Sequence, residues 1–267
     1  MKTKKRVLLA IEIATPLIII VLWWAYTAFV LPVSSPFVTI YYPTPVVIAE
    51  RFAEDFLSPE ILVNGVPTLV RFLVGYGIAA VVGIVLGVII GSSSAVRLLS
   101  MPVITFFRAM PAVVLIPIVT IFLGITDAQK ILLIALASLW PILLNAIDGV
   151  RSLDFTIRES AISYRIKGFD RYRFVIVPAA LPQIFAGLRA AVAVALIVVV
   201  VVELFGAGSG QGIGSYLATA KTGFEFAKLW AGILFLGIVG LIFNGIFLLV
   251  ERRVLRWHHG RNAVEAS

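Results

Sequence analysis

Residues 66–91 read VPTLVRFLVGYGIAAVVGIVLGVIIG and hold a single charged residue, Arg71. A transmembrane helix needs about 20 consecutive, mostly apolar residues, so this stretch predicts a helix that crosses a membrane. Five more stretches meet the same requirement, and we expect prolines 111, 117 and 141 to interrupt the third and fourth spans. The six predicted spans are Val7–Leu31, Val66–Gly91, Leu98–Gly124, Ile131–Ile147, Leu181–Leu204 and Leu229–Val250.

The composition excludes several protein classes. Of the 267 residues, 61% are hydrophobic and 13% are charged, against about 45–50% and about 25% in soluble proteins. A soluble globular domain, a disordered chain and a soluble head on one anchor are therefore excluded. The chain has no cysteine, which excludes disulfides, thiolate metal sites and a cysteine nucleophile. We predict an all-α membrane protein, a polytopic bundle of six transmembrane helices.

The second span also carries small residues at intervals of four. Residues at this spacing lie in one stripe along a helix and let a neighbouring helix approach closely. We assign this stripe to helix packing rather than to a ligand site. It consists of Gly75, Ala79, Gly83, Gly87 and Gly91.

The basic residues predict the orientation of the chain. Fifteen of the 22 Lys and Arg residues fall in segments on one side of the spans, and only Arg51, Lys130, Lys221 and Lys228 fall on the other. Because short cytoplasmic loops carry the positive excess, both termini are expected in the cytoplasm. The net charge of +8 is then explained without nucleic acid. We expect a cytoplasmic N-terminus (1–6), one transmembrane domain (7–250) and a cytoplasmic tail (251–267).

The N-terminal apolar run is too long for a cleavable signal and lacks an A-x-A site, so it is interpreted as a retained helix. The first outer loop, 32–64, is expected to hold a short amphipathic helix at Ile48–Leu57 and otherwise extended chain. The outer loop 204–228 is glycine-rich, but G-x-G-x-x-G fits at no register and no Lys-Ser/Thr directly follows a glycine, as a P-loop requires. A phosphate-binding loop is rejected, and a flexible or tightly turned segment is expected, with a re-entrant segment as the alternative.

The inner loop, 148–180, is too long for a simple connector. Phe155, Ile162, Ile166 and Phe169 lie at intervals of seven, four and three, which predicts an apolar stripe on one helical face. This stripe is compatible with docking onto a partner. Packing against the inner ends of the spans, or lying in the headgroup layer, explains it equally well.

Four charged residues lie within or near the spans, where a charge is costly. Arg71 and Glu203 are near outer ends, from which they can reach water. Arg108, Arg189 and Glu203 are candidates to line a translocation path for an anion. The alternative is that these charges form ion pairs or carbonyl contacts that fix helix packing.

A set of short motifs resembles a known family, the permease subunits of binding-protein-dependent ABC importers, in their nitrate/sulfonate/taurine branch. The resemblance covers residues 60–257, and its inner-loop motif is Glu159-Ser160-Ala161 followed by Val177–Pro182. The other matching segments are Arg108–Pro111, Leu115–Pro117, Phe122–Ile125, Asp127, Lys130, Gly187–Arg189, Glu203, Gly210 and Gly212–Gly214. One departure is clear: the family's loop glycine falls six residues after the glutamate, where this chain has Arg165, and the nearest glycine is Gly168.

The resemblance implies a multi-pass permease in the plasma (inner) membrane of a prokaryote, acting as a homodimer. Its partners would be two ABC ATP-binding subunits, an extracytoplasmic solute-binding protein and membrane lipid. ATP and Mg would bind the partner subunit, and this chain would bind no cofactor and carry no catalytic residue or metal. The cytoplasmic coupling helices in the inner loop would dock onto the ATPase. The coupling residues would be Glu159, Ser160, Ala161, Tyr164, Arg165 and Gly168.

Three other classes of protein fit the sequence less well. A self-contained secondary transporter or channel is the main alternative, but the two halves show no clear repeat and intramembrane acids are few. A membrane enzyme is disfavoured because His258 and His259 lie in the tail without a carboxylate cluster. A structural scaffold would not need the long, arginine-rich inner loop.

Overall fold

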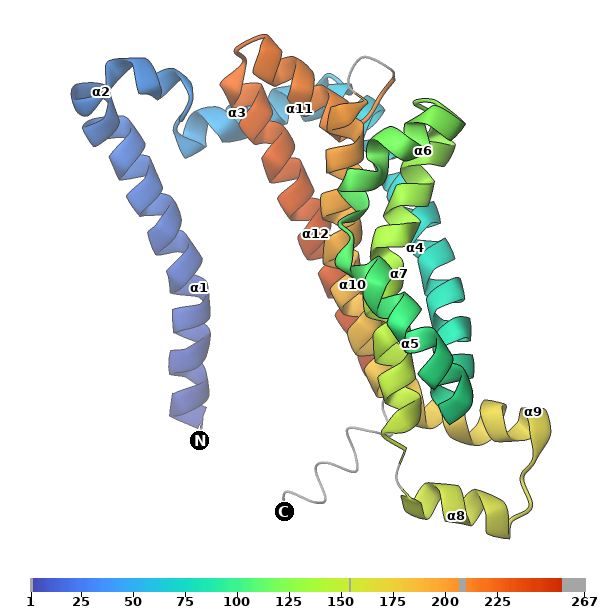
Figure 1. Cartoon of the computed structure of the whole chain (residues 1–267). Helices are drawn as coiled ribbons and strands as arrows, with labels where there is room; N and C mark the ends of the chain where they lie inside the picture. Colours follow the sequence, from blue (N-terminus) through green and yellow to red (C-terminus); the bar gives the residue numbers. More distant parts are fainter. Residues whose placement is uncertain (1, 154, 207–209, 256–267) are drawn as a thin grey trace.

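The computed structural model of the chain describes residues 2–153, 155–206 and 210–255 (Figure 1). Within these ranges the regular structure is helical, without a β-strand. The prediction of an all-α polytopic bundle is therefore confirmed. The α-helices are α1 (Lys2–Ala25), α2 (Leu31–Ser34), α3 (Pro45–Leu57), α4 (Glu60–Ser92), α5 (Ser94–Ala109), α6 (Ile116–Leu123), α7 (Asp127–Arg151), α8 (Phe155–Ser163), α9 (Gly168–Arg171), α10 (Val177–Phe205), α11 (Ile213–Thr222) and α12 (Phe226–Val254). Short 3-10 or π-helical segments are η1 (Tyr26–Val30), η2 (Pro36–Ile40), η3 (Ala112–Leu115) and η4 (Tyr172–Ile176).

Six segments of the described chain are long and apolar enough to cross a membrane, if α5 and α6 are counted as one broken span. The five single segments are Ala14–Ser34, Glu60–Ser92, Asp127–Arg151, Gly168–Phe205 and Phe226–Val254. In the broken span, Ser94–Ala109 and Ala112–Leu123 meet at 80°. Most helices are longer than the predicted spans. The prediction covered only the apolar residues, whereas the helices continue into the polar residues at either end.

Only one of the three prolines breaks a span as predicted. The helix stops at Met110–Pro111, between α5 and η3. Pro117 lies in the first turn of α6, where a missing N–H costs little. Pro141 lies inside α7, which continues without interruption, so the predicted break in the fourth span is wrong. A membrane helix tolerates such a proline when neighbouring helices surround it.

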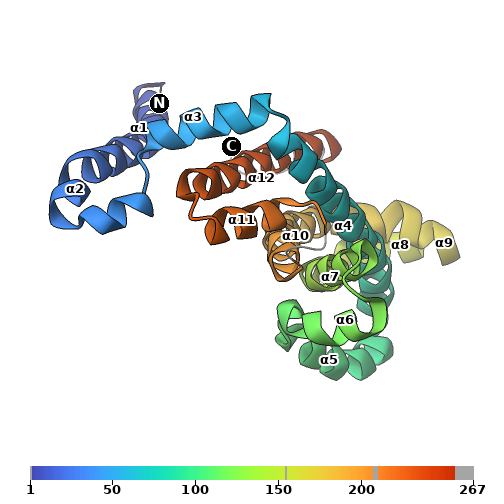
Figure 2. The ribbon, with the colours of Figure 1, turned by 90° about the horizontal axis from the view of Figure 1, so that it is seen from above.

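Helix α7 is the centre of the bundle and packs between α4 and α10 (Figure 2). The small-residue stripe of α4 faces α7 at close range. A Cβ atom added to Gly75 would lie 2.8 Å from Cβ of Ile134, and one added to Gly87 would lie 2.4 Å from Cβ of Ala146. Ala79 is buried in the same stripe. Gly83 meets Ile142 and Gly91 meets Val150 in the same way.

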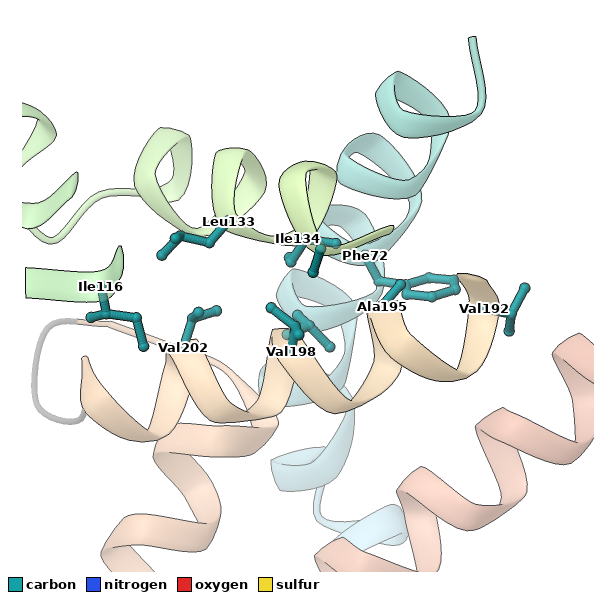
Figure 3. Close-up of a cluster of buried hydrophobic side chains, with 10 residues drawn as sticks. Phe72, Ile116, Leu133, Ile134, Val192, Ala195, Val198 and Val202 are labelled. Atoms are coloured by element: carbon teal, nitrogen blue, oxygen red, sulfur yellow. The ribbon is translucent and has the colours of Figure 1, made fainter. Parts of the chain in front are cut away.

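The largest buried cluster joins α4, α6, α7 and α10. Figure 3 shows Phe72 of α4, Leu133 of α7 and Val198 of α10 converging in it. Ile116, at the start of α6, completes the cluster. The broken span is therefore attached to the bundle by both halves, through Ile116 at the start of α6 and through Ile104 of α5, which packs against Leu143 of α7.

The bundle has two distinct ends (Figure 1). We call the end that carries α8 and α9 the loop end, and the opposite end, which carries α3 and α11, the α11 end. Helices α5 and α6 form one edge of the bundle, and α3 and α12 lie toward the other (Figure 2). Helix α1 approaches α12 through Trp23 and Trp230, whose ring centroids are 5.2 Å apart.

The segment predicted as a mostly extended outer loop is largely helical, so that prediction is wrong. The predicted amphipathic helix is present as α3, and α2 and η2 occupy the residues before it. Prolines do not oppose these helices because Pro32 and Pro45 stand in first turns, where their fixed φ suits a helix start. Thr44 caps α3 by accepting a hydrogen bond from the Val47 amide.

Candidate functional sites

The loop end is built around a tight turn between α8 and α9. The Ile166 amide donates to the Ala161 carbonyl and the Arg165 amide to the Ile162 carbonyl, both at 2.9 Å. These two bonds form a Schellman motif, whose turn residue takes the left-handed conformation and is usually glycine. Arg165 takes that place with φ of +55°. The departure from the family glycine therefore leaves the turn formed, with an arginine in it.

This turn shows that the predicted apolar stripe is wrong. Phe155 and Phe169 belong to separate helices, so the four apolar residues do not share one continuous helical face. Ile162 and Phe169 are exposed, whereas Ile166 is half-buried. The prediction was wrong because the spacing of apolar residues in the sequence does not reveal the chain reversal at Tyr164–Lys167.

Ala161 is the point where α8 meets the bundle. Its side chain is 3% exposed, and it separates two cavities of about 690 Å³ and about 190 Å³. The larger cavity lies between α8 and the start of α10, and its lining includes Ser160, Tyr164 and Gln183. Among the α8 side chains that the structure describes, only Ala161 is buried and Ile157 is half-buried, so α8 buries little of itself against the spans. Such an element can shift relative to the bundle without unpacking a core.

The other predicted coupling residues are exposed, and Ser160 and Tyr164 also line the larger cavity. Glu159 and Ser160 are exposed, and the Ser160 hydroxyl donates to the Thr156 carbonyl at 2.8 Å. Tyr164 is 80% exposed and Phe169 is 75% exposed. Gly168, with φ of +59°, has open space around its Cα. The loop end therefore presents aromatic side chains and an acid next to several arginines.

We expect Arg165→Gly to strengthen this turn. A left-handed conformation costs a non-glycine residue about 1–2 kcal/mol, so the turn should gain about 1 kcal/mol, or about five-fold in amide protection. Hydrogen exchange at the amides of residues 165 and 166 measures this directly. Arg165→Val is the matched control, and it should lower the protection because a β-branched residue fits this conformation poorly. Equal protection in both variants would contradict the assigned turn.

The α11 end contains a buried ion network. Glu203 of α10 is fully buried, and its carboxylate accepts a 2.6 Å hydrogen bond from Nη1 of Arg71 on α4. Thr68 donates to both carboxylate oxygens, at 3.0 and 2.8 Å. Arg71 also binds Asp127 of α7, from Nε at 2.8 Å and Nη2 at 2.7 Å. The expectation that Arg71 and Glu203 reach water is wrong, because they neutralise each other inside the protein.

The glycine-rich segment encloses Glu203. The Gly214 amide donates to Oε2 of Glu203 at 3.0 Å, and Arg71 donates to the Gln211 carbonyl at 2.7 Å. An added Cβ on Gly212 would lie 2.6 Å from Cδ of Glu203, and one on Gly214 would lie 2.4 Å from its Cβ. Glycine is thus required for close approach to a carboxylate, not to a phosphate. Residues 213–222, expected to be flexible or turned, form the buried helix α11; residues 207–209 lie outside the described ranges.

A second polar cluster ties α3 to α11 at the same end. Asp55 is buried, and it accepts hydrogen bonds from Arg51 at 3.1 Å and from the Tyr216 hydroxyl. Burial of Arg51 alone would lower its pKa, but the hydrogen bond and charge of Asp55 raise it. Burial, followed by the hydrogen bond and charge of Asp55, raises the pKa of the Tyr216 hydroxyl well above its usual value. Tyr216 therefore stays a hydrogen-bond donor at physiological pH.

The three arginines predicted within spans differ in their partners. Arg71 binds Asp127 and Glu203, and Arg189 forms an ion pair with Glu251 of α12. Arg108 is exposed in the last turn of α5. Within the described ranges, no carboxylate lies within ion-pair distance of Arg108. Of the three proposed path residues, Arg108 alone has a side chain free of both burial and ion pairing.

Within the described ranges, no group of three or more His, Asp or Glu side chains could hold a metal ion. His258 and His259, weighed as an enzyme site, lie outside the described residues, together with the rest of the tail beyond residue 255.

Comparison with known proteins identifies the family. Residues 83–256 match the family described as "Binding-protein-dependent transport system inner membrane component". The chain belongs to this family. This permease is 32% identical to the aliphatic sulfonates transport permease protein SsuC of Bacillus subtilis, over 84% of this chain and 79% of SsuC. It is 28% identical to the taurine transport system permease protein TauC of Escherichia coli, over 93% and 90% of the two chains.

A third relative of the permease is the bicarbonate transport system permease protein CmpB of Synechococcus elongatus, 26% identical over 72% of this chain and 68% of CmpB. The expected kinship with ABC importer permeases of the nitrate/sulfonate/taurine type is confirmed. The permease is accordingly a multi-pass inner-membrane component. Sequence reasoning missed the contacts of the Arg71–Glu203 pair in this permease, above all those of Thr68 with Glu203 and of Asp127 with Arg71. The only sign of these contacts in the sequence was that Glu203 and the glycines at 210, 212 and 214 belong to the same set of family motifs.

Proposed function

We propose that the permease is the membrane subunit of an ATP-driven importer and works as two copies with two separate ATPase subunits. The loop end and both termini would face the cytoplasm, and a solute-binding protein would deliver the substrate to the α11 end. The substrate would be a small organic or inorganic anion, such as a sulfonate, taurine or nitrate. The positive excess in the segments on the loop side supports this orientation.

The observation that carries this proposal is the construction of the loop end. Ala161 of α8 is buried, while Tyr164 is 80% exposed and Phe169 is 75% exposed. Exposed aromatic residues beside charged ones are typical of protein interfaces. A cleft in an ATPase subunit would cover them.

In the proposed mechanism, the two ATPase subunits close on each other when they bind ATP. The α8 helices, which are docked on the ATPase subunits, move with these subunits. Because α10 is continuous with η4 and α9, a shift of the loop end is passed directly to a span. The spans would then alternate between inward-facing and outward-facing states, as a ligand-driven shift between two conformations.

We expect Glu159→Lys to uncouple ATP hydrolysis from transport. The side chain is exposed, so the variant should reach the membrane in normal amount. A new positive charge in the loop that also carries Arg165 and Lys167 would repel rather than bind the partner surface, and uptake should fall at least ten-fold. Asp148→Lys is the matched control, because Asp148 is an exposed acid at the end of α7 outside the docking helices.

The test is affinity purification of the tagged permease from cells expressing its operon, followed by uptake and ATPase assays. Recovery of an ATPase subunit in equal molar amount, with transport lost in Glu159→Lys and kept in Asp148→Lys, is the expected result. Normal transport in Glu159→Lys would remove the coupling role of the loop. A permease that transports solute alone would favour a self-contained carrier or channel.

A further inference from the structure

Arg108 lies at the one break within a span that the described part of the permease contains. Helix α5 begins at the loop end and has 16 residues, which span about 24 Å at 1.5 Å per residue. The hydrocarbon core of a membrane is about 30 Å thick, so α5 ends inside it. In Figure 1 the chain between α5 and α6 passes alongside the middle part of the bundle. Arg108 and the Met110–Pro111 break therefore lie at membrane depth.

Lipid is not a suitable neighbour for this break. Carbonyl groups in the last turn of a helix lack intrahelical partners, and Pro111 has no N–H to offer. Non-helical backbone at membrane depth is tolerated only where protein buries it or where it lines water. Ala109 and Pro111 are exposed in the single chain, so neither condition is met without a further component.

The charge of Arg108 leads to the same conclusion. A charged side chain inside a membrane faces a bundle interior or a water-filled path. Arg71 and Arg189 satisfy their charges with carboxylates, whereas Arg108 has no such partner in the described part of the chain. Its position in the last turn of α5 favours a cation, because the carbonyl end of the helix dipole is negative. The Arg108 guanidinium is thus available to an anionic ligand.

We propose that Arg108 is the anion-binding residue of the translocation path, which runs along the break between α5 and α6 against a second copy of the permease. In a two-fold dimer each copy contributes the same patch, so two Arg108 side chains face one path. A guanidinium group binds carboxylate, sulfonate or nitrate oxygens through paired N–H donors. Without a fixed carboxylate beside it, the site can release one anion and accept the next. This inference rests on the proposed import of small anions.

The first test measures uptake into proteoliposomes that hold the permease with the ATPase and binding protein of its operon. The probes are taurine, ethanesulfonate, nitrate and bicarbonate. Arg108→Gln should lower uptake of the transported probe at least ten-fold, and Arg108→Lys should retain part of it because the charge remains. Arg97→Gln, the same change on the same helix near the loop end, should stay within two-fold of the wild type.

The second test measures access of water to the site. The permease has no cysteine, so Arg108→Cys introduces the only thiol of the chain. Methanethiosulfonate reagents react with the thiolate, which forms in water and not in lipid. In the assembled complex, an anionic ethylsulfonate reagent should label Arg108→Cys at least ten-fold faster than Leu241→Cys. Leu241 is an exposed residue within α12, and α12 lies across the bundle from α5 (Figure 2).

The outcomes separate this inference from the proposed function. Wild-type uptake rates in Arg108→Gln, or no labelling of Arg108→Cys in the assembled complex, would overturn the role of Arg108 and leave the importer intact. If the wild-type complex imports none of the four anions, the proposed substrate class fails and the inference fails with it. Loss of uptake in Arg108→Gln with labelling of Arg108→Cys supports both.

Discussion

Replacement of Arg71 by methionine is expected to leave little folded permease. The substitution removes the cation that neutralises Glu203, whose carboxylate is fully buried. Removing one partner of a buried ion pair costs about 3–5 kcal/mol, because the other charge stays in the interior unpaired. The measurement is the thermal stability of the detergent-solubilised protein, followed by size-exclusion chromatography.

Two further variants test the cause of this loss. Arg71→Met combined with Glu203→Met should recover part of the stability, since a buried pair can often be replaced by apolar residues of similar volume. Recovery should be incomplete because Thr68 and the Gly214 amide lose their acceptor. Asp127→Asn should have a small effect, because the Asp127 side chain is 67% exposed and exposed pairs contribute about 0–1 kcal/mol.

A different pattern would contradict the network. If Asp127→Asn were as damaging as Arg71→Met, the pair with Asp127 and not the one with Glu203 would carry the stability. If the double variant were less stable than Arg71→Met alone, the buried charge of Glu203 would not be the source of the loss.

The ion network also shows the limit of sequence reasoning for this permease. Hydropathy located the spans because every segment in a membrane must be apolar over about 20 residues. The sequence showed Arg71 and Glu203 as charged residues within or near spans, but they are separated by 132 positions. Nothing in the local pattern joins them. Their pairing is a property of how α4 and α10 pack, so it became visible only in the structure.

The prediction of one apolar stripe at the loop end was wrong for a different reason. The spacing of Phe155, Ile162, Ile166 and Phe169 describes one helix, but the chain reverses at Arg165. The usual signal for such a reversal is glycine, and here an arginine takes the left-handed conformation. The resemblance to the family marked this position as a departure. Only the hydrogen bonds of the turn reveal that its geometry persists.

The small-residue stripe of α4 leads to the second large expected effect. Gly87→Leu should strongly reduce the amount of folded permease. Even a single added carbon would lie 2.4 Å from Cβ of Ala146 and 3.0 Å from the Leu143 carbonyl oxygen. The second neighbour is backbone, which cannot move aside without moving α7. Overpacking a dense core costs about 1–3 kcal/mol and occasionally more, and α7 is the centre of the bundle.

Gly77→Leu is the matched control on the same helix. A Cβ atom at Gly77 would meet nothing within 4 Å, so the larger side chain has open space. Stability close to the wild type is therefore expected, measured by the melting temperature in detergent for both variants. Equal losses in Gly77→Leu and Gly87→Leu would mean that bulk on α4, and not its contact with α7, is harmful.

A compensating pair sharpens the test. Gly87→Ala should destabilise the permease through its contact with Ala146, and Ala146→Gly should remove the nearest atom in its way. If α4 and α7 pack as described, the double variant is more stable than Gly87→Ala alone and loses less stability than the sum of the two single changes in a double-mutant cycle. Recovery should stop short of the wild type, because the Leu143 carbonyl remains in place. Strict additivity of the two changes would mean that residues 87 and 146 do not touch in the folded permease.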